Sequence, residues 1–112
     1  MSLVARFSQT TVVCYGKFTT GARETMPITV AGKLPPGWES GNTVVRVPAG
    51  TYLYELLADW TPDVEWGPGT TTEIVAQFER RLIIKCTEGQ GIGFRTLPPG
   101  AGAEAGFSLT PL

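Results

Sequence analysis

Apolar and polar residues alternate in short runs along the chain, a pattern typical of β-strands that pack one face against a core. The most regular run covers residues 73–87, where the even positions from Ile74 to Cys86 are apolar except for Arg80. One straight strand of this length would extend about 50 Å, which exceeds the width of a small domain. We therefore expect a bulge or corner at 79–81, where Arg80 would otherwise point into the core.

A helix over residues 72–81 is the alternative for the first part of this run. Ile74, Phe78 and Leu82 lie four residues apart, a spacing that would place them on one helical face. The threonine at position 72 would then cap the first turn. The alternation with period two continues to residue 87, and we therefore favour the strand.

Shorter alternating runs predict further strands, at 3–8, 11–20, 27–30, 43–47, 51–57 and 107–110. The run 51–57 has apolar side chains on both faces, with Tyr52, Tyr54 and Leu56 on one and Leu53 and Leu57 on the other. A strand with one face in water would alternate more cleanly. This strand is therefore expected to be sandwiched in the fold or covered by a partner.

The number and spacing of these runs define the expected fold class. The 112 residues fit one domain, 1–112, with eight or nine short strands and little or no helix. Fourteen glycines and nine prolines punctuate the strands, and they predict loops at 31–42, 58–70 and 88–106. The most economical architecture is all-β, a β-sandwich or jelly-roll-like fold.

Charge and hydropathy exclude several classes of partner. Charged residues are 17% of the chain, below the roughly 25% of a typical domain, so part of the surface is expected to be covered or merely polar. The basic residues are scattered, and the pair Arg80-Arg81 lies beside Glu79, which argues against nucleic acid. No apolar run suits an export signal or a membrane span. We expect synthesis in a cytoplasm and no membrane partner.

Residues for catalysis or metal binding are scarce. The chain has no histidine, and none of its serines lies in a Gly-x-Ser-x-Gly turn. Cys14 and Cys86 both lie in apolar runs and are expected to be buried thiols, with a disulfide as the less favoured alternative. Two cysteines without histidine cannot complete a zinc site. We therefore expect no metal, no cofactor and no enzymatic activity.

One acidic loop keeps an enzymatic alternative open. Asp59, Asp63 and Glu65 lie between Trp60 and Trp66, and paired acids beside aromatic rings are found in glycosidase sites. Such a loop could also hold calcium, although it lacks the spacing of any defined calcium loop. Acids that form turns in a solvated loop are the simpler interpretation.

The three tryptophans, Trp38, Trp60 and Trp66, all lie in Gly- and Pro-rich connections. Tryptophan is enriched at protein interfaces, and its ring also stacks on sugars. A third interpretation is that these rings close the open ends of the sandwich. The residues expected at an interface are Trp38, Tyr52, Leu53, Tyr54, Trp60, Trp66 and Phe107.

Residues 44–54, Val-Val-Arg-Val-Pro-Ala-Gly-Thr-Tyr-Leu-Tyr, resemble the strand pair of complement-type and tumour-necrosis-factor-like jelly rolls. In length, low charge and Gly/Pro-rich arms the chain is also similar to phage capsid cement proteins. This resemblance implies a structural virion protein, made in the host cytoplasm, whose partners are the major capsid protein and copies of itself in a homotrimer. The alternative is a carbohydrate- or receptor-binding module, such as a fibre head, that uses the loop tryptophans.

Overall fold

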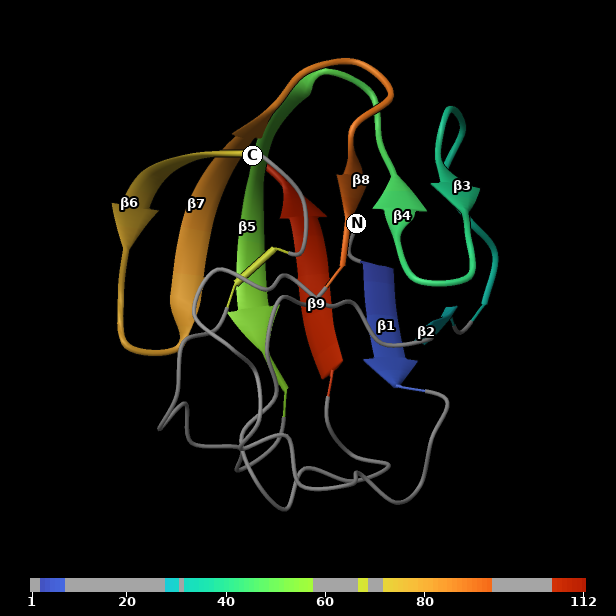
Figure 1. Ribbon diagram of the computed structural model, residues 1–112, viewed down its shortest axis with the longest axis horizontal. Helices are drawn as coiled ribbons and strands as arrows, with labels where there is room; N and C mark the ends of the chain where they lie inside the picture. The colour runs from blue at the N-terminus through green and yellow to red at the C-terminus, as the bar shows by residue number, and fades with distance from the viewer. Residues whose placement is uncertain (1–2, 8–27, 31, 58–66, 69–71, 94–105) are drawn as a thin grey trace, which may run out of the picture.

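The computed structural model describes residues 3–7, 28–30, 32–57, 67–68, 72–93 and 106–112. This part of the chain forms nine β-strands and no helix (Figure 1). The strands lie in two sheets, one with six strands and one with three, and all the pairings are antiparallel. The prediction of an all-β, sandwich-like fold is confirmed.

The six-stranded sheet has the order β2-β1-β9-β5-β7-β6. Its strands are β1 (Leu3–Phe7), β2 (Ile28–Val30), β5 (Gly50–Leu56), β6 (Glu73–Gln77), β7 (Arg81–Cys86) and β9 (Gly106–Pro111). The C-terminal strand β9 lies between β1 and β5, so that the first and last described strands of the chain are neighbours (Figure 1). Most of these pairings join strands that are distant in sequence, which no local pattern specifies.

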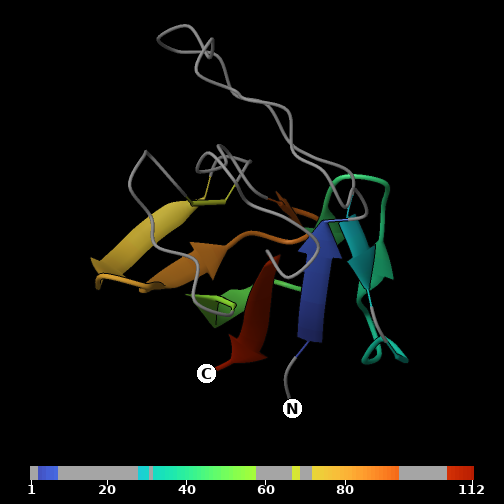
Figure 2. The ribbon, with the colours of Figure 1, turned by 90° about the horizontal axis from the view of Figure 1, so that it is seen from below.

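The three-stranded sheet has the order β3-β4-β8, formed by β3 (Glu39–Ser40), β4 (Val45–Arg46) and β8 (Gly91–Ile92). It lies beside the β1–β2 end of the large sheet (Figure 2). Val45, Val47 and Ile92 from this region are fully buried, and they join the side chains of the large sheet in one core cluster.

Alternation along β5 and β7 builds the centre of this core. Side chains of β5 and β7 that point inward are buried, namely Tyr52, Tyr54, Leu56, Leu82, Ile84 and Cys86. β9 adds Phe107 and Leu109, and β1 adds Leu3 and Ala5. Period two therefore correctly groups the side chains that share a face of each strand in the middle of the sheet.

The run 73–87 is two strands rather than one. The chain turns back at residues 78–80, where the Phe78 N–H donates to the Arg81 carbonyl at 2.8 Å, and β6 pairs with β7 as a hairpin. The expected corner at 79–81 is therefore a full reversal, and the bulge lies instead between Ile74 and Ala76. The helical alternative is wrong for the described residues of this segment.

The turn also explains how the chain accommodates Arg80. Its side chain does not enter the core, because it lies in the connection between the strands, and its Nη2 donates to the Leu57 carbonyl at 3.3 Å. Since the chain reverses, β6 becomes the edge strand of the sheet. The apolar even positions of β6 are thereby left at the sheet edge instead of in the core.

Two short strands occur where loops were expected. β3 lies within 31–42, and β8 lies within 88–106. A Cβ atom at Gly91 would approach the Val44 Cγ2 to 2.8 Å, so the glycine allows β8 to pack closely on its neighbours. The predicted strand at 11–20 and most of the predicted loop at 58–70 lie outside the described residues.

Candidate interaction surfaces

The two tyrosines of β5 belong to the core rather than to a surface. Tyr54 stacks on Phe107 with a centroid distance of 4.6 Å, and its hydroxyl donates to the Gly93 carbonyl at 3.2 Å. The Tyr52 hydroxyl donates to the Pro48 carbonyl at 2.6 Å. These bonds tie β5 to the segments around β4 and β8, so both rings and both hydroxyls serve the fold.

Trp38 likewise closes the interior. Its ring meets Tyr52 edge-on with a centroid distance of 5.6 Å, and only 9% of the residue is exposed. This position matches the interpretation in which a loop tryptophan closes one end of the sandwich. Because Trp38, Tyr52, Tyr54 and Phe107 are all buried in the domain itself, the expectation that they form an interface is corrected here.

Several other candidates lie outside the described residues, namely Cys14, Asp59, Trp60, Asp63, Glu65 and Trp66. Of the seven expected interface residues, Leu53 alone is described and lies away from the core. Tyr52 and Tyr54 point inward, and Leu53 between them therefore faces the opposite side of the large sheet.

Cys86 is a free, buried thiol at the end of β7. Burial raises its pKa to about 11, because the thiolate would lose its hydration in this environment. Burial also raises the pKa of Tyr52, and the proximity of Cys86 adds to this effect. At neutral pH the thiol therefore remains protonated, which is the opposite of what a nucleophilic cysteine requires.

Three large apolar residues in or next to the edge strand β6 are exposed, namely Ile74, Val75 and Phe78, and they are here called the β6 patch. Their exposed fractions are 41%, 55% and 48%. The Arg81 guanidinium lies over the Phe78 ring at 5.5 Å from its centroid, a cation–π contact that restrains the ring. Sequence reasoning missed this surface, because it assigned Ile74 and Phe78 to the core face of one long strand and treated Val75 as an apolar exception on the opposite, mostly polar face.

The outer face of the large sheet presents a second pattern along β5 and β7. Leu53 is paired with Ile83, and Glu55 is paired with Arg81. Paired residues of an antiparallel sheet project to the same side. Leu53 and Ile83 are both partly buried, and they form the apolar centre of this face.

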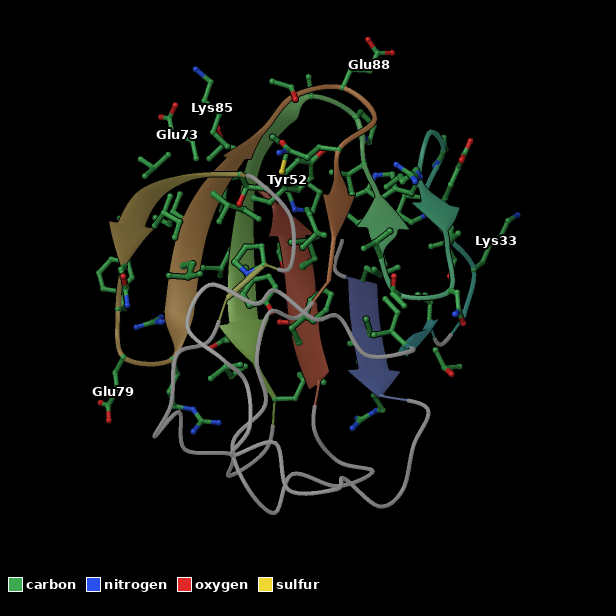
Figure 3. The ribbon with its side chains drawn as sticks, viewed as in Figure 1. Lys33, Tyr52, Glu73, Glu79, Lys85 and Glu88 are labelled. Atoms are coloured by element: carbon green, nitrogen blue, oxygen red, sulfur yellow. The ribbon has the colours of Figure 1, made fainter. Side chains whose placement is uncertain are left out.

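An open depression of about 610 Å³ lies at the end of β6 and β7. Its lining comprises Thr72, Glu73, Lys85, Thr87 and Gln90. Glu73 and Lys85 are cross-strand neighbours and lie together at the upper end of the hairpin in Figure 3. The backbone N–H of Thr87 donates to the Gln90 Oε1 at 3.0 Å, so part of the lining is engaged in the turn itself.

Within the described ranges, no group of three or more acidic, cysteine or histidine side chains is placed to hold a metal ion. No helix in the same part of the chain is long and apolar enough to span a membrane. Comparison with protein-family models, with curated proteins and with solved structures finds no match to this chain.

Proposed function

We propose that this protein is a non-enzymatic structural subunit of a virion, a decoration or cement protein that binds neighbouring major capsid subunits. The β6 patch is the observation that carries the proposal. Ile74, Val75 and Phe78 are large, apolar and about half exposed, and they lie in or directly after the edge strand β6. Several large apolar side chains exposed along one edge strand of a small domain are typical of a site that a partner covers.

The physical role of such a contact is to bury apolar surface at the junctions of a shell. Each large apolar side chain that leaves water contributes about 1.5–3 kcal/mol before the costs of association are subtracted. β6 is held by β7 along its inner side, and Arg81 restrains Phe78, so little ordering is needed on binding. A modest contact of this kind becomes effective when many copies act on one particle.

The carbohydrate-binding alternative has weaker support. A sugar platform needs aromatic rings at the surface, and the ring of Trp38 is packed against Tyr52 in the core. Trp60 and Trp66 lie outside the described residues. Phe78 is exposed, but the Arg81 guanidinium already lies over its ring, and the aliphatic Ile74 and Val75 beside it suit a protein partner better than a sugar. We therefore prefer the capsid proposal.

The test is co-sedimentation with capsid shells. The major capsid protein to use is the one encoded beside the gene for this chain, and mass spectrometry of purified virions provides a parallel readout. We expect the wild-type protein to sediment with the assembled shells, and we expect V75D/F78D to bind at least about 10-fold more weakly.

A matched control for this experiment is K33E, which changes an exposed residue on the opposite side of the molecule (Figure 3). We expect K33E to bind as the wild type does. Absence of the protein from virions, together with no binding to shells, would refute the proposal. Unchanged binding by V75D/F78D would refute the role of the β6 patch.

A further inference from the structure

The outer face of β5 and β7 has a pattern that is complementary to itself. Leu53 and Ile83 lie side by side at its centre, and Glu55 and Arg81 lie side by side one step along the strands. One step on the same face corresponds to two residues, or about 7 Å. The face therefore has an apolar centre with one acidic and one basic group at its rim, the usual layout of a protein interface.

A second copy can pack on this face about a two-fold axis that runs parallel to the strands, midway between β5 and β7. This operation places β7 of each copy over β5 of the other. Leu53 then lies over Ile83 of the second copy, and Glu55 faces Arg81 of the second copy, and both contacts occur twice. Contacts that repeat in this way define an isologous interface.

We propose that the protein forms a homodimer through this outer face, with Leu53 and Ile83 at its centre and two Glu55–Arg81 ion pairs at its rim. This contact uses none of the β6 patch side chains, Ile74, Val75 and Phe78. Arg81 is common to both surfaces, because its guanidinium also lies over the Phe78 ring. The trimer expected from the resemblance would need two different surfaces on each copy. The β5–β7 pattern instead matches itself under a two-fold rotation.

The charges select this axis over the other in-plane two-fold axis. An axis at right angles to the strands, through Leu53 and Ile83, would place β7 over β7 of the second copy. Arg81 would then face Lys85 of the second copy, since both residues lie on the outer face of β7 on either side of Ile83. Two such like-charge contacts would oppose association.

The residues beside Leu53 and Ile83 on the adjacent strands leave room for the sheet of the second copy. Leu53 is flanked by Thr110 on β9, and Ile83 is flanked by Ala76 on β6. Both flanking side chains are small, whereas Leu53 and Ile83 are long enough to fill the roughly 10 Å between packed sheets. Packed sheets cross at about 30°, which shifts the Glu55 and Arg81 positions by an amount that their long side chains can span.

The test is sedimentation equilibrium of the full chain with charge-reversed variants. We expect the wild type to dimerise at concentrations of about 100 µM or below, in the range of modest interfaces. In a dimer of E55R, the arginine introduced at position 55 would face Arg81 of the second copy, so two positive charges would meet. In a dimer of R81E, the glutamate introduced at position 81 would face Glu55 of the second copy, so two negative charges would meet. We expect each variant alone to dimerise at least about 10-fold more weakly.

An equimolar mixture of E55R and R81E separates contact between copies from effects within one copy. In the mixed dimer, the arginine introduced at position 55 faces the glutamate introduced at position 81, and the two unchanged residues also face each other. We expect the mixture to recover the affinity of the wild type. If either substitution weakened dimerisation by disturbing its own copy, mixing the two variants would not restore the affinity.

Two further variants complete the experiment. L53D places a charge at the centre of the face and is expected to abolish the dimer, whereas V75D alters the β6 patch and is expected to leave the dimer unchanged. Circular dichroism tests whether each variant is folded. If a single charge variant does not fold, the double variant E55R/R81E takes its place, and we expect it to dimerise as the wild type does because the two charges are exchanged. A wild-type monomer, a trimer, or a mixture that fails to recover would overturn the dimer. Shell binding is measured with V75D/F78D, whereas L53D and E55R change the dimer face without touching the contact between Arg81 and Phe78. Either proposal can therefore fail while the other holds.

Discussion

Gly106 provides a sharp test of the packing between β1 and β9. It is buried in β9 opposite Arg6, and a Cβ atom at this position would collide with the Ala5 carbonyl oxygen. The same Cβ would lie 2.9 Å from the Arg6 Cα and 3.1 Å from the Ala5 carbonyl carbon. These are backbone atoms, which cannot move aside by changing a rotamer. G106A therefore requires β1 and β9 to separate.

The expected loss follows from the elements that this separation disturbs. Overpacking usually costs about 1–3 kcal/mol, and we expect G106A to lie at the upper end, about 3 kcal/mol, because the obstruction is backbone. Leu3 and Ala5 on β1 are buried core residues, so a displaced strand also weakens the core. For a domain of this size, a loss of 3 kcal/mol lowers Tm by roughly 12 °C or more.

The assay is urea and thermal unfolding followed by circular dichroism. We expect a lower midpoint with an unchanged slope, since the folded and unfolded surfaces remain comparable. G50A is the matched control in the neighbouring strand, where the nearest atoms to a Cβ would be Tyr52 side-chain atoms at 3.5–3.6 Å, an ordinary contact distance. G50A should change stability by less than about 1 kcal/mol. If the G106A variant were as stable as the wild type, the close approach of β1 and β9 would be refuted.

Three further predictions concern the core. G91A should lose about 1–2 kcal/mol in urea unfolding, because its Cβ would press on Val44, and V44A/G91A should be more stable than the sum of the single losses predicts. Y54F should lose about 1–2 kcal/mol in the same assay, because the buried Gly93 carbonyl loses a donor; no loss would contradict that bond. Burial raises the pKa of Cys86 from 9.0 to about 11, so the folded state favours the protonated thiol. The difference in stability between wild type and C86A should therefore be constant below pH 9 and shift against the wild type as the pH rises towards 11.

The β6–β7 hairpin shows why part of the interaction surface could not be predicted. The alternation from Ile74 to Cys86 correctly indicates strand, and it correctly places Leu82, Ile84 and Cys86 in the core. It contains no turn signal of glycine or proline at 78–80, so a reversal is not apparent from the pattern. Exposure of Phe78 depends on that reversal, because only then does β6 lie at the edge of the sheet.

The sequence by itself predicts an all-β fold, which the described residues confirm, and it sorts the side chains of β5 into two faces. Tyr52, Tyr54 and Leu56 alternate with Leu53 and Glu55, and that period is a local property of the backbone. The same period does not say which face of a strand meets the core when both faces are apolar. For this reason the tyrosines were expected at an interface as readily as in the interior.

The tertiary structure decided which strands are neighbours. β9 lies between β1 and β5, and β7 pairs with β5, although these segments are distant in the sequence. These pairings bring Leu53 beside Ile83 and Glu55 beside Arg81, and they leave Ile74 and Phe78 on an open edge. Strand order depends on how the whole chain closes its core, and side-chain alternation within one strand carries no information about it.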